Sequence, residues 1–306
     1  MSNRTRIWRI LRTVLLTIII LLLMLLAYGY FIGSRNIVVH EQTLYFDDLP
    51  DAFDGYRICQ FTDLHIATFN KGHKDDVDSI ISKINSQNCD MIAFVGDAVN
   101  KSSGELDGYR RKLSKLSAPD GVFSVLGNHD YGLYYGYENE DDRLADIEEM
   151  HRKQRSYGWN LLLNEHRFIH RGNDSIAIVG VENWGTGISK VTGKQFPQYG
   201  DIHKAGKGIK KSDFCILLSH DPTHWRAQVV PQTSFQLTLA GHTHGGQFKI
   251  FGWSPCQMSY SEWSGIYMVG KQILNVSEGV GNSIIPFRFG AWPEINVITL
   301  KVKSNK

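Results

Sequence analysis

The chain has 306 residues, of which 42% are hydrophobic and 21% are charged. This length suffices for one large α/β domain, and the composition excludes a disordered chain, a collagen-like chain and a disulfide-stapled miniprotein. The formal net charge is +2, yet the first 35 residues hold five arginines and no acidic residue, which leaves 28 basic and 31 acidic residues in the rest. The body is therefore mildly acidic, and its charge gives no sign of a nucleic-acid partner.

An uncharged segment, residues 13–34, follows a basic flank at residues 1–12. At about 1.5 Å per residue the segment makes a helix of roughly 33 Å, which is enough to cross a bilayer core of about 30 Å. Four arginines precede the segment and one follows it, so we expect the N-terminus inside and the body outside. The alternatives are a cleaved signal peptide and a body that faces the cytoplasm.

Short apolar runs alternate with helical stretches in the body. The predicted strands are residues 57–61, 91–95, 122–126, 175–179, 215–218, 235–239 and 294–302. Apolar residues three and four apart predict helices over 75–88 and 139–157, the second capped by Asn139 with Leu144, Ile147 and Met150 turned inward. Strands and helices alternate in the first part of the body, and mostly strands follow in the later part. This order predicts one α/β domain with a sheet core covered by helices.

Polar residues follow five of these predicted strands directly. They are Asp63 and His65, then Asp97, then Asn128, His129 and Asp130, then His220, then His242 and His244. In α/β folds, ligands bind outside the carboxyl ends of the strands, so we expect these side chains to converge.

The candidate metal ligands offer oxygen and nitrogen donors and no thiolate: Asp63, His65, Asp97, Asn128, His220, His242 and His244. The set is too large for one tetrahedral zinc and too rich in histidine for calcium or magnesium. Two divalent ions that share one bridging carboxylate fit better, with manganese favoured and iron and zinc as alternatives. Such a pair can hold a hydroxide and clamp the attacking and leaving oxygens of a phosphoryl displacement.

These motifs resemble those of the calcineurin-like metallophosphoesterases, whose pattern is D-x-H, G-D, G-N-H-[DE], H and G-H-x-H. The run Gly241–Gln247 and the tail 277–295 resemble a membrane-anchored bacterial branch. The resemblance implies a four-layer α-β-β-α fold of two mixed sheets, preceded here by the transmembrane helix. We therefore expect a linker and entry segment at 35–55 and a catalytic domain at 56–306, held in the bacterial inner (cytoplasmic) membrane.

The resemblance also implies roles for the site residues. Asp63, His65 and His244 would bind one ion, Asn128, His220 and His242 would bind the other, and Asp97 would bridge them. His129 would contact the phosphate and protonate or steady the leaving oxygen.

One position departs from the protein-phosphatase pattern G-D-x-x-D-R-G, because Asn100 stands where those relatives have the Asp that orients the catalytic histidine. We expect His129 to work either beside the neutral Asn100 or with Asp130 as its partner. The missing Arg-Gly argues against a phosphoprotein phosphatase.

The leading functional hypothesis is a membrane-anchored two-metal hydrolase of phosphoesters or pyrophosphates. The resemblance includes enzymes that cleave UDP-2,3-diacylglucosamine in lipid A synthesis, but that substrate is made on the cytoplasmic side. A body outside favours the alternative, a phosphodiesterase or phosphatase that acts on envelope lipids or glycolipids. A non-catalytic metal-binding scaffold is the rival from another class, and the oligomeric state stays open.

Aromatic residues cluster just after the Gly-Asn-His-Asp motif, including Tyr134 and Tyr135. Together with tryptophans such as Trp253 and Trp263, they either cover the edge of the sheet or line a mouth that stacks a base or sugar or touches lipid.

Overall fold

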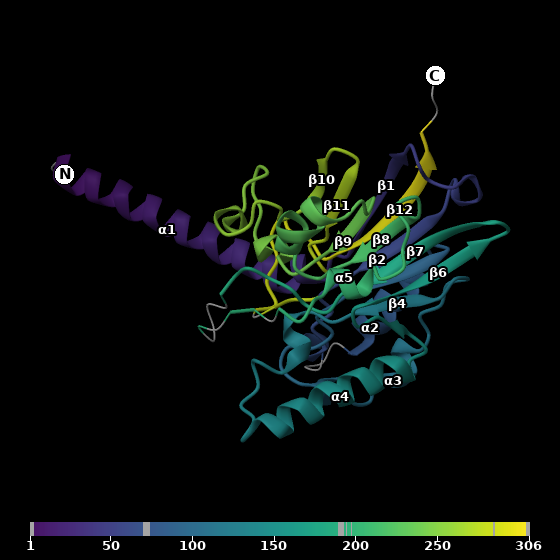
Figure 1. The fold of residues 1–306 in the computed structure, drawn as a ribbon. Helices are drawn as coiled ribbons and strands as arrows, with labels where there is room; N and C mark the ends of the chain where they lie inside the picture. The colour runs from purple at the N-terminus through teal and green to yellow at the C-terminus, as the bar shows by residue number, and fades with distance from the viewer. Residues whose placement is uncertain are drawn as a thin grey trace.

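The computed structural model describes residues 3–69, 74–188, 193, 195–196, 198–283 and 285–303 (Figure 1). Two mixed six-stranded sheets form the centre of the domain. The first has the order β1 (Val38–Phe46), β12 (Glu294–Val302), β2 (Arg57–Phe61), β3 (Met91–Val95), β4 (Val122–Val125) and β5 (Asn160–Leu161). The second has the order β10 (Gly265–Val269), β11 (Gln272–Val276), β9 (Leu237–Ala240), β8 (Phe214–Leu218), β7 (Asp174–Gly180) and β6 (Glu165–Arg171).

The sheets pack face to face through apolar side chains such as Ile58, Val95, Ile216 and Leu239, all of them buried. Helices α2 (Lys74–Asn85), α3 (Arg110–Leu113) and α4 (Glu140–Ser156) lie outside the first sheet. The short helices α5 (Ile202–Ala205) and α6 (Val230–Gln232) and the turn Trp225–Val229 lie outside the second. The predicted fold of two mixed sheets between helices is confirmed.

The parallel strands β2, β3 and β4 of one sheet and β7, β8 and β9 of the other carry the chain toward the site. Buried apolar runs such as Met91–Val95 and Phe214–Leu218 form the interior strands because both of their faces are covered. The polar residues that follow these strands therefore meet at one end of the molecule.

Helix α4 begins as predicted, because the Asn139 side chain accepts a hydrogen bond from the Asp142 amide at 2.9 Å. Ile147 and Met150 are buried, but Leu144 is 47% exposed, so its predicted inward position is wrong. At this residue the helix has not yet reached the core. Five strands, β1, β5, β6, β10 and β11, were not predicted, and β1 lies within the segment expected to be a linker.

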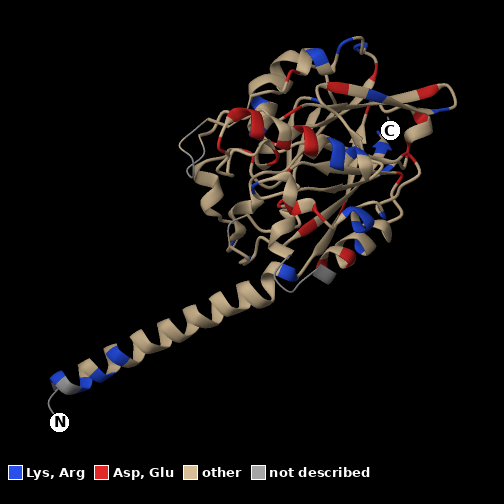
Figure 2. Cartoon of the chain, turned by 90° about the horizontal axis from the view of Figure 1, so that it is seen from below, with Lys and Arg blue, Asp and Glu red and all other residues tan. Residues whose placement is uncertain are grey.

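Helix α1 (Asn3–Phe31) extends away from the domain, with arginines toward its N-terminal end and no acidic residue (Figure 2). Residues Arg6–Arg35 form a candidate membrane span with a mean hydropathy of 2.8. The helix joins the domain at the end of the sheets from which the loops after β9 project (Figure 1).

Candidate metal centre

The seven candidate ligands all lie just beyond the carboxyl ends of strands, as predicted. Asp63 and His65 follow β2, Asp97 follows β3, Asn128 follows β4, His220 follows β8, and His242 and His244 follow β9. All seven are buried or nearly so, and the two sheets bring them into two adjoining clusters. A third group overlaps both clusters, because His65 and Asp97 also lie within 4.8 Å of a ring nitrogen of His129.

The first cluster consists of Asp63, His65 and His244, whose candidate ligand atoms lie within 4.8 Å of one another. Nε2 of His244 is 3.3 Å from Oδ1 of Asp63 and 3.1 Å from Nε2 of His65. These three atoms point at one another, which is the arrangement a single cation requires.

The second cluster consists of Asp97, His220 and His242, joined by Asn128. Nε2 of His220 is 3.2 Å from Oδ2 of Asp97, and Nδ1 of His242 is 2.7 Å from Oδ1 of Asn128. The same Oδ2 atom of Asp97 lies 3.6 Å from Nε2 of His65 in the first cluster. Asp97 therefore stands between the two groups.

The backbone at this site is strained. Five of the seven candidate ligands adopt positive φ angles that side chains rarely tolerate: Asp63 (55°), His65 (43°), Asp97 (58°), His242 (73°) and His244 (52°). Each such residue costs about 1–3 kcal/mol and persists where the surrounding fold enforces it. Tight turns at the strand ends aim these side chains inward at the expense of local stability.

Two buried atoms test whether the site suits a cation. Oδ1 of Asp63 and Nε2 of His220 make no hydrogen bond among the residues that the structure describes, although oppositely charged partners lie 3.3 Å and 3.2 Å away. A carboxylate oxygen and an imidazole nitrogen buried without hydrogen bonds are costly unless a cation binds them. The donor set therefore fits divalent metal ions.

The pKa shifts of the candidate ligands also favour a bound cation. Burial raises the pKa of Asp63 to about 6 and lowers the pKa of His65 to about 3. Burial alone would disfavour the charged forms of Asp97 and His220. Attraction to His220 and His129 outweighs burial at Asp97 and lowers its pKa well below the usual range. Attraction to Asp97 outweighs burial at His220 and raises its pKa to about 10. A positive charge beside Asp97 is thus strongly favoured, and a metal ion can supply it in place of the proton.

His129 lies at the edge of both clusters. Its ring contacts that of His65, with 4.8 Å between the centroids, and its Nδ1 lies 2.7 Å from the backbone carbonyl oxygen of Asn100. Because that carbonyl only accepts, Nδ1 carries the proton and Nε2 remains available to a substrate.

Asn100 lies beside His129, as expected, but contacts it through its backbone, whereas Asp130 contacts other groups. The side-chain amide of Asn100 donates to the carbonyl of Ser283 at 2.8 Å, so only its backbone holds His129. The Asp130 carboxylate accepts hydrogen bonds from the amides of Gly127, Asp97 and Ala98 at 2.8–3.0 Å. Asp130 therefore holds together the turns that carry Asp97 and Asn128. Among the described residues, no hydrogen bond or ion pair joins Asp130 to His129.

Residues 56–246 match the family of calcineurin-like phosphoesterases. The chain belongs to this family. Membership implies a metal-dependent phosphoester hydrolase, and the matched segment contains every candidate ligand.

Relatives span most of the chain. An uncharacterized metallophosphoesterase of Bacillus subtilis, YkuE, is 29% identical over 90% of both chains. An uncharacterized metallophosphoesterase of Helicobacter pylori is 30% identical over 90% of this chain and 67% of its own length. A protein of Danio rerio called transmembrane protein with metallophosphoesterase domain is 26% identical over 92% of this chain, but only 62% of its own length is covered.

Three residues at the site of this phosphoesterase were not predicted as supporting residues. Tyr134 stacks on the ring of His129 at 4.1 Å between centroids, and its hydroxyl accepts from the Asn128 amide at 2.9 Å. The hydroxyl of Tyr260 lies 2.8 Å from Nε2 of His242. Nη2 of the fully buried Arg288 lies 3.1 Å from Nδ1 of His244. The cluster of tyrosines after the Gly-Asn-His-Asp motif could have indicated that Tyr134 lies at the site. No local pattern around Arg288 indicates its contact with His244.

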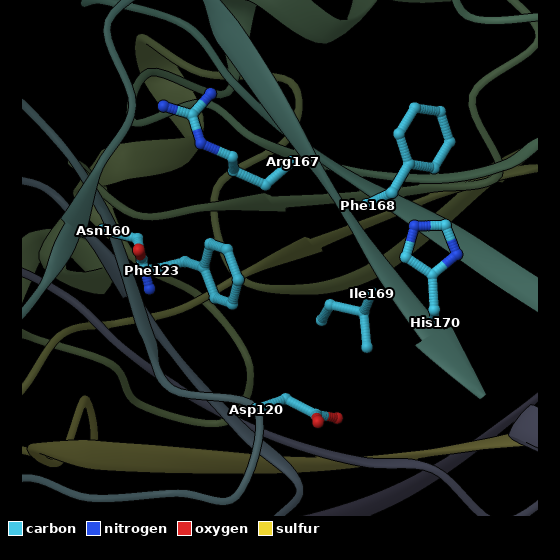
Figure 3. Close-up of a pocket in the computed structure, with 7 residues that line it drawn as sticks. All are labelled: Asp120, Phe123, Asn160, Arg167, Phe168, Ile169 and His170. Carbon is cyan, nitrogen blue, oxygen red and sulfur yellow. The ribbon is translucent and has the colours of Figure 1, made fainter.

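A cavity of about 340 Å³ lies elsewhere, lined by residues that include Asp120, Phe123, Arg167 and His170 (Figure 3). Asp120 precedes β4 and Phe123 lies near the start of that strand, whereas Asn128 follows its end. The cavity is therefore at the amino end of β4, away from the metal clusters.

Proposed function

We propose that this chain is a membrane-anchored two-metal hydrolase of phosphoesters. Asp63, His65 and His244 hold one ion, Asn128, His220 and His242 hold the other, and Asp97 bridges the two. The position of Asp97 carries the proposal, because its Oδ2 lies close to a histidine of each cluster, 3.6 Å from His65 and 3.2 Å from His220. Oδ1 of Asp63 is less central, since it lies 3.3 Å from His244 but 4.0 Å from His220.

Two bound divalent ions would lower the pKa of water and neutralise the phosphate oxygens as charge develops. Within the protein, the carbonyl of Asn100 fixes the His129 tautomer by accepting from Nδ1. Nε2 of His129 can then hold a proton and deliver it to the leaving oxygen. Tyr134 restricts the rotation of this ring by stacking on it.

Manganese is the proposed metal, with iron and zinc as alternatives. The ligands combine four histidine nitrogens with two carboxylates and one amide oxygen, which suits borderline divalent ions. The absence of cysteine from the ligand set removes the thiolate preference that favours structural zinc.

The proposed substrate is a phosphoester attached to a lipid and presented on the outer side of the inner membrane. Four arginines before the apolar span favour an N-terminus inside and a domain outside. A topology reporter fused at Lys306 should therefore read out as external. A cytoplasmic readout would instead favour a nucleotide–lipid such as UDP-2,3-diacylglucosamine.

The activity itself is tested with bis-p-nitrophenyl phosphate and the purified full chain. We expect manganese-dependent turnover that falls at least a thousandfold in Asp97→Ala and His129→Ala. His170→Ala is the matched control, because this histidine is exposed on β6 and should leave turnover unchanged. If no divalent ion supports turnover, the chain is a metal-binding scaffold rather than an enzyme.

A further inference from the structure

The end of helix α1 packs against the domain through one face. Leu25 of the helix is half-buried and Gly29 is buried, as is Gly33 at the start of the 3-10 turn Gly33–Arg35 that follows the helix. The backbone amide of Arg288 donates to the carbonyl of Gly29 at 3.1 Å. A Cβ on Gly29 would lie 2.2 Å from the Phe287 ring, and one on Gly33 would lie 2.0 Å from the Arg288 carbonyl oxygen. The two glycines therefore permit direct contact between the helix and the loop before β12.

This contact fixes the distance between the domain and the bilayer. A hydrocarbon core of about 30 Å needs about 20 helical residues. Counted from the first uncharged position, Thr13, those residues reach Ile32, so Gly29 lies inside the span. The loop that touches Gly29 must consequently lie at the membrane interface, and no linker separates the domain from the lipid.

The loops that contact this junction carry five exposed apolar side chains, and we call them the rim: Ile250, Phe251, Trp253, Met258 and Ile285. Their segments are tied to the helix. Tyr28 packs against Phe289 with 6.2 Å between ring centroids, and Phe289 pairs through its backbone with Phe248 and Lys249. The rim thus lies beside the place where the helix leaves the domain.

The rim has two further properties of a lipid-contacting surface. Phe251 is fully exposed and Met258 is 85% exposed, and Phe251 also has a φ of 48°, which is a strained angle for an aromatic residue. Residues 243–261 and 279–293 contain no acidic residue, and their charged side chains are Lys249 and Arg288. Lys249 is paired with Glu278 and Arg288 is buried, so the surface is apolar with little net charge, which suits insertion among lipid chains.

The same segments continue into the metal centre. The Ser254 hydroxyl donates to the carbonyl of Gly245, next to His244, and the Gln247 amide donates to the carbonyl of Ile285. Tyr260, two residues beyond Met258, contacts His242. Only a few residues therefore separate the rim from the candidate ligands.

We propose that the rim inserts into the leaflet from which α1 emerges and holds the metal centre at the level of the lipid phosphates. The partner of this surface is the phospholipid bilayer, and the substrate class is a phosphoester whose lipid tail stays in that leaflet. The substrate part of this inference rests on the proposed function, whereas the insertion of the rim does not.

Insertion is measured on the full chain in vesicles of dioleoylphosphatidylglycerol and dioleoylphosphatidylcholine. Nitroxide labels are attached to Phe251→Cys and Met258→Cys, with Phe168→Cys on β6, at the other end of the domain, as the matched control (Figure 1). The four native cysteines are buried and do not compete for the label. We expect the rim labels to collide at least fivefold more with oxygen, relative to a soluble nickel chelate, than the label at position 168. Rim labels that match the control would overturn the proposal.

A kinetic comparison tests the substrate class. In the double variant Phe251→Asp, Met258→Asp, we expect at least a tenfold loss of turnover on a p-nitrophenyl phosphodiester of diacylglycerol embedded in these vesicles. Turnover of soluble bis-p-nitrophenyl phosphate should not change. Equal activity of the variant and the parent on the embedded diester would refute the substrate assignment. If the parent hydrolyses neither diester, the proposed function fails, but the labels still decide whether the rim inserts.

Discussion

Nη2 of Arg288 lies 3.1 Å from Nδ1 of His244, and both side chains are buried. The same guanidinium donates to the carbonyls of Gly281 and Ala291, so one side chain joins a candidate metal ligand to the loop that touches the membrane helix. Burial lowers the pKa of Arg288 to about 10, which still leaves it charged at neutral pH. The anchor and the metal centre are thus connected through a single residue.

Replacing Arg288 with Met should weaken the first metal cluster. With a metal on Nε2, Nδ1 of His244 keeps its proton and the guanidinium cannot accept it, so Arg288 acts on His244 through its hydrogen bond to the backbone carbonyl at 3.5 Å. Residues that orient a metal-binding histidine typically contribute tenfold to a hundredfold in affinity, so we expect at least a tenfold loss of metal retention against a chelator. The carbonyls left without donors should lower the free energy of unfolding by about 2–4 kcal/mol. Arg288→Lys keeps the positive charge but not the forked donor geometry, so its metal retention and its free energy of unfolding should lie between those of the parent and the Met variant. Unchanged metal retention in the Met variant would refute the orienting role.

Tyr134 should support the site through two separable contacts, its ring with His129 and its hydroxyl with Asn128. Tyr134→Phe loses the hydroxyl that accepts from Asn128 but keeps the stacking, so we expect a loss of about 1 kcal/mol, roughly fivefold in turnover. Tyr134→Ala loses both contacts, for which about 2 kcal/mol, roughly thirtyfold, is expected. The exposed Tyr135 is the control, and its Ala variant should be unaffected. Equal losses in the Phe and Ala variants would show that stacking has no role.

The stability of the chain should fall in mild acid because of His224. This histidine is fully buried between Ser219 and Gln228, and burial lowers its pKa to about 4. Below about pH 6.5 the unfolded chain binds a proton that the folded chain does not, so stability is lost as the pH falls from 6.5 to 4. The shift corresponds to about 3 kcal/mol at most.

The measurement compares denaturant unfolding of the parent and of His224→Gln in the presence of a chelator. The Gln variant should lose less stability between pH 7 and pH 4.5 than the parent does, whatever its stability at pH 7. Parallel curves for the two proteins would mean that His224 is not the group that titrates.

The positions of the candidate ligands could be predicted from the sequence because each follows a buried apolar strand within a few residues. A strand end fixes where the next residues lie, and parallel strands collect their carboxyl ends at one edge. Asp97 and His220 are 123 residues apart in the sequence, yet both positions follow from this rule.

The strands that were missed lie mainly at sheet edges. β1, β5, β6 and β10 are the four edges of the two sheets. β1, β5 and β6 have no continuous apolar run, whereas β10 has one (Gly-Ile-Tyr-Met-Val) but alternates between exposed and half-buried residues. β6 has the sequence Glu-His-Arg-Phe-Ile-His-Arg, for example, with one buried residue. Edge strands owe their place to pairing with neighbours, which composition alone does not reveal.

The supporting residues were harder to predict for a different reason. The contact between Asn100 and His129 uses a backbone carbonyl, so the identity of the side chain says nothing about it. Arg288 reaches His244 from a loop 44 residues away, with no periodic pattern to indicate the approach. Such contacts depend on the path of long loops, which only the folded structure defines.

The most direct test of the two-metal account is a count of bound manganese on the purified full chain after equilibration and removal of free ion. The account predicts two ions per chain in the parent and in His129→Ala, which keeps all seven ligands but loses turnover. It predicts fewer than two in Asp97→Ala, since both clusters lose their shared carboxylate. A parent chain that binds no manganese, iron or zinc, or that hydrolyses bis-p-nitrophenyl phosphate equally well after all metal is removed, would contradict it.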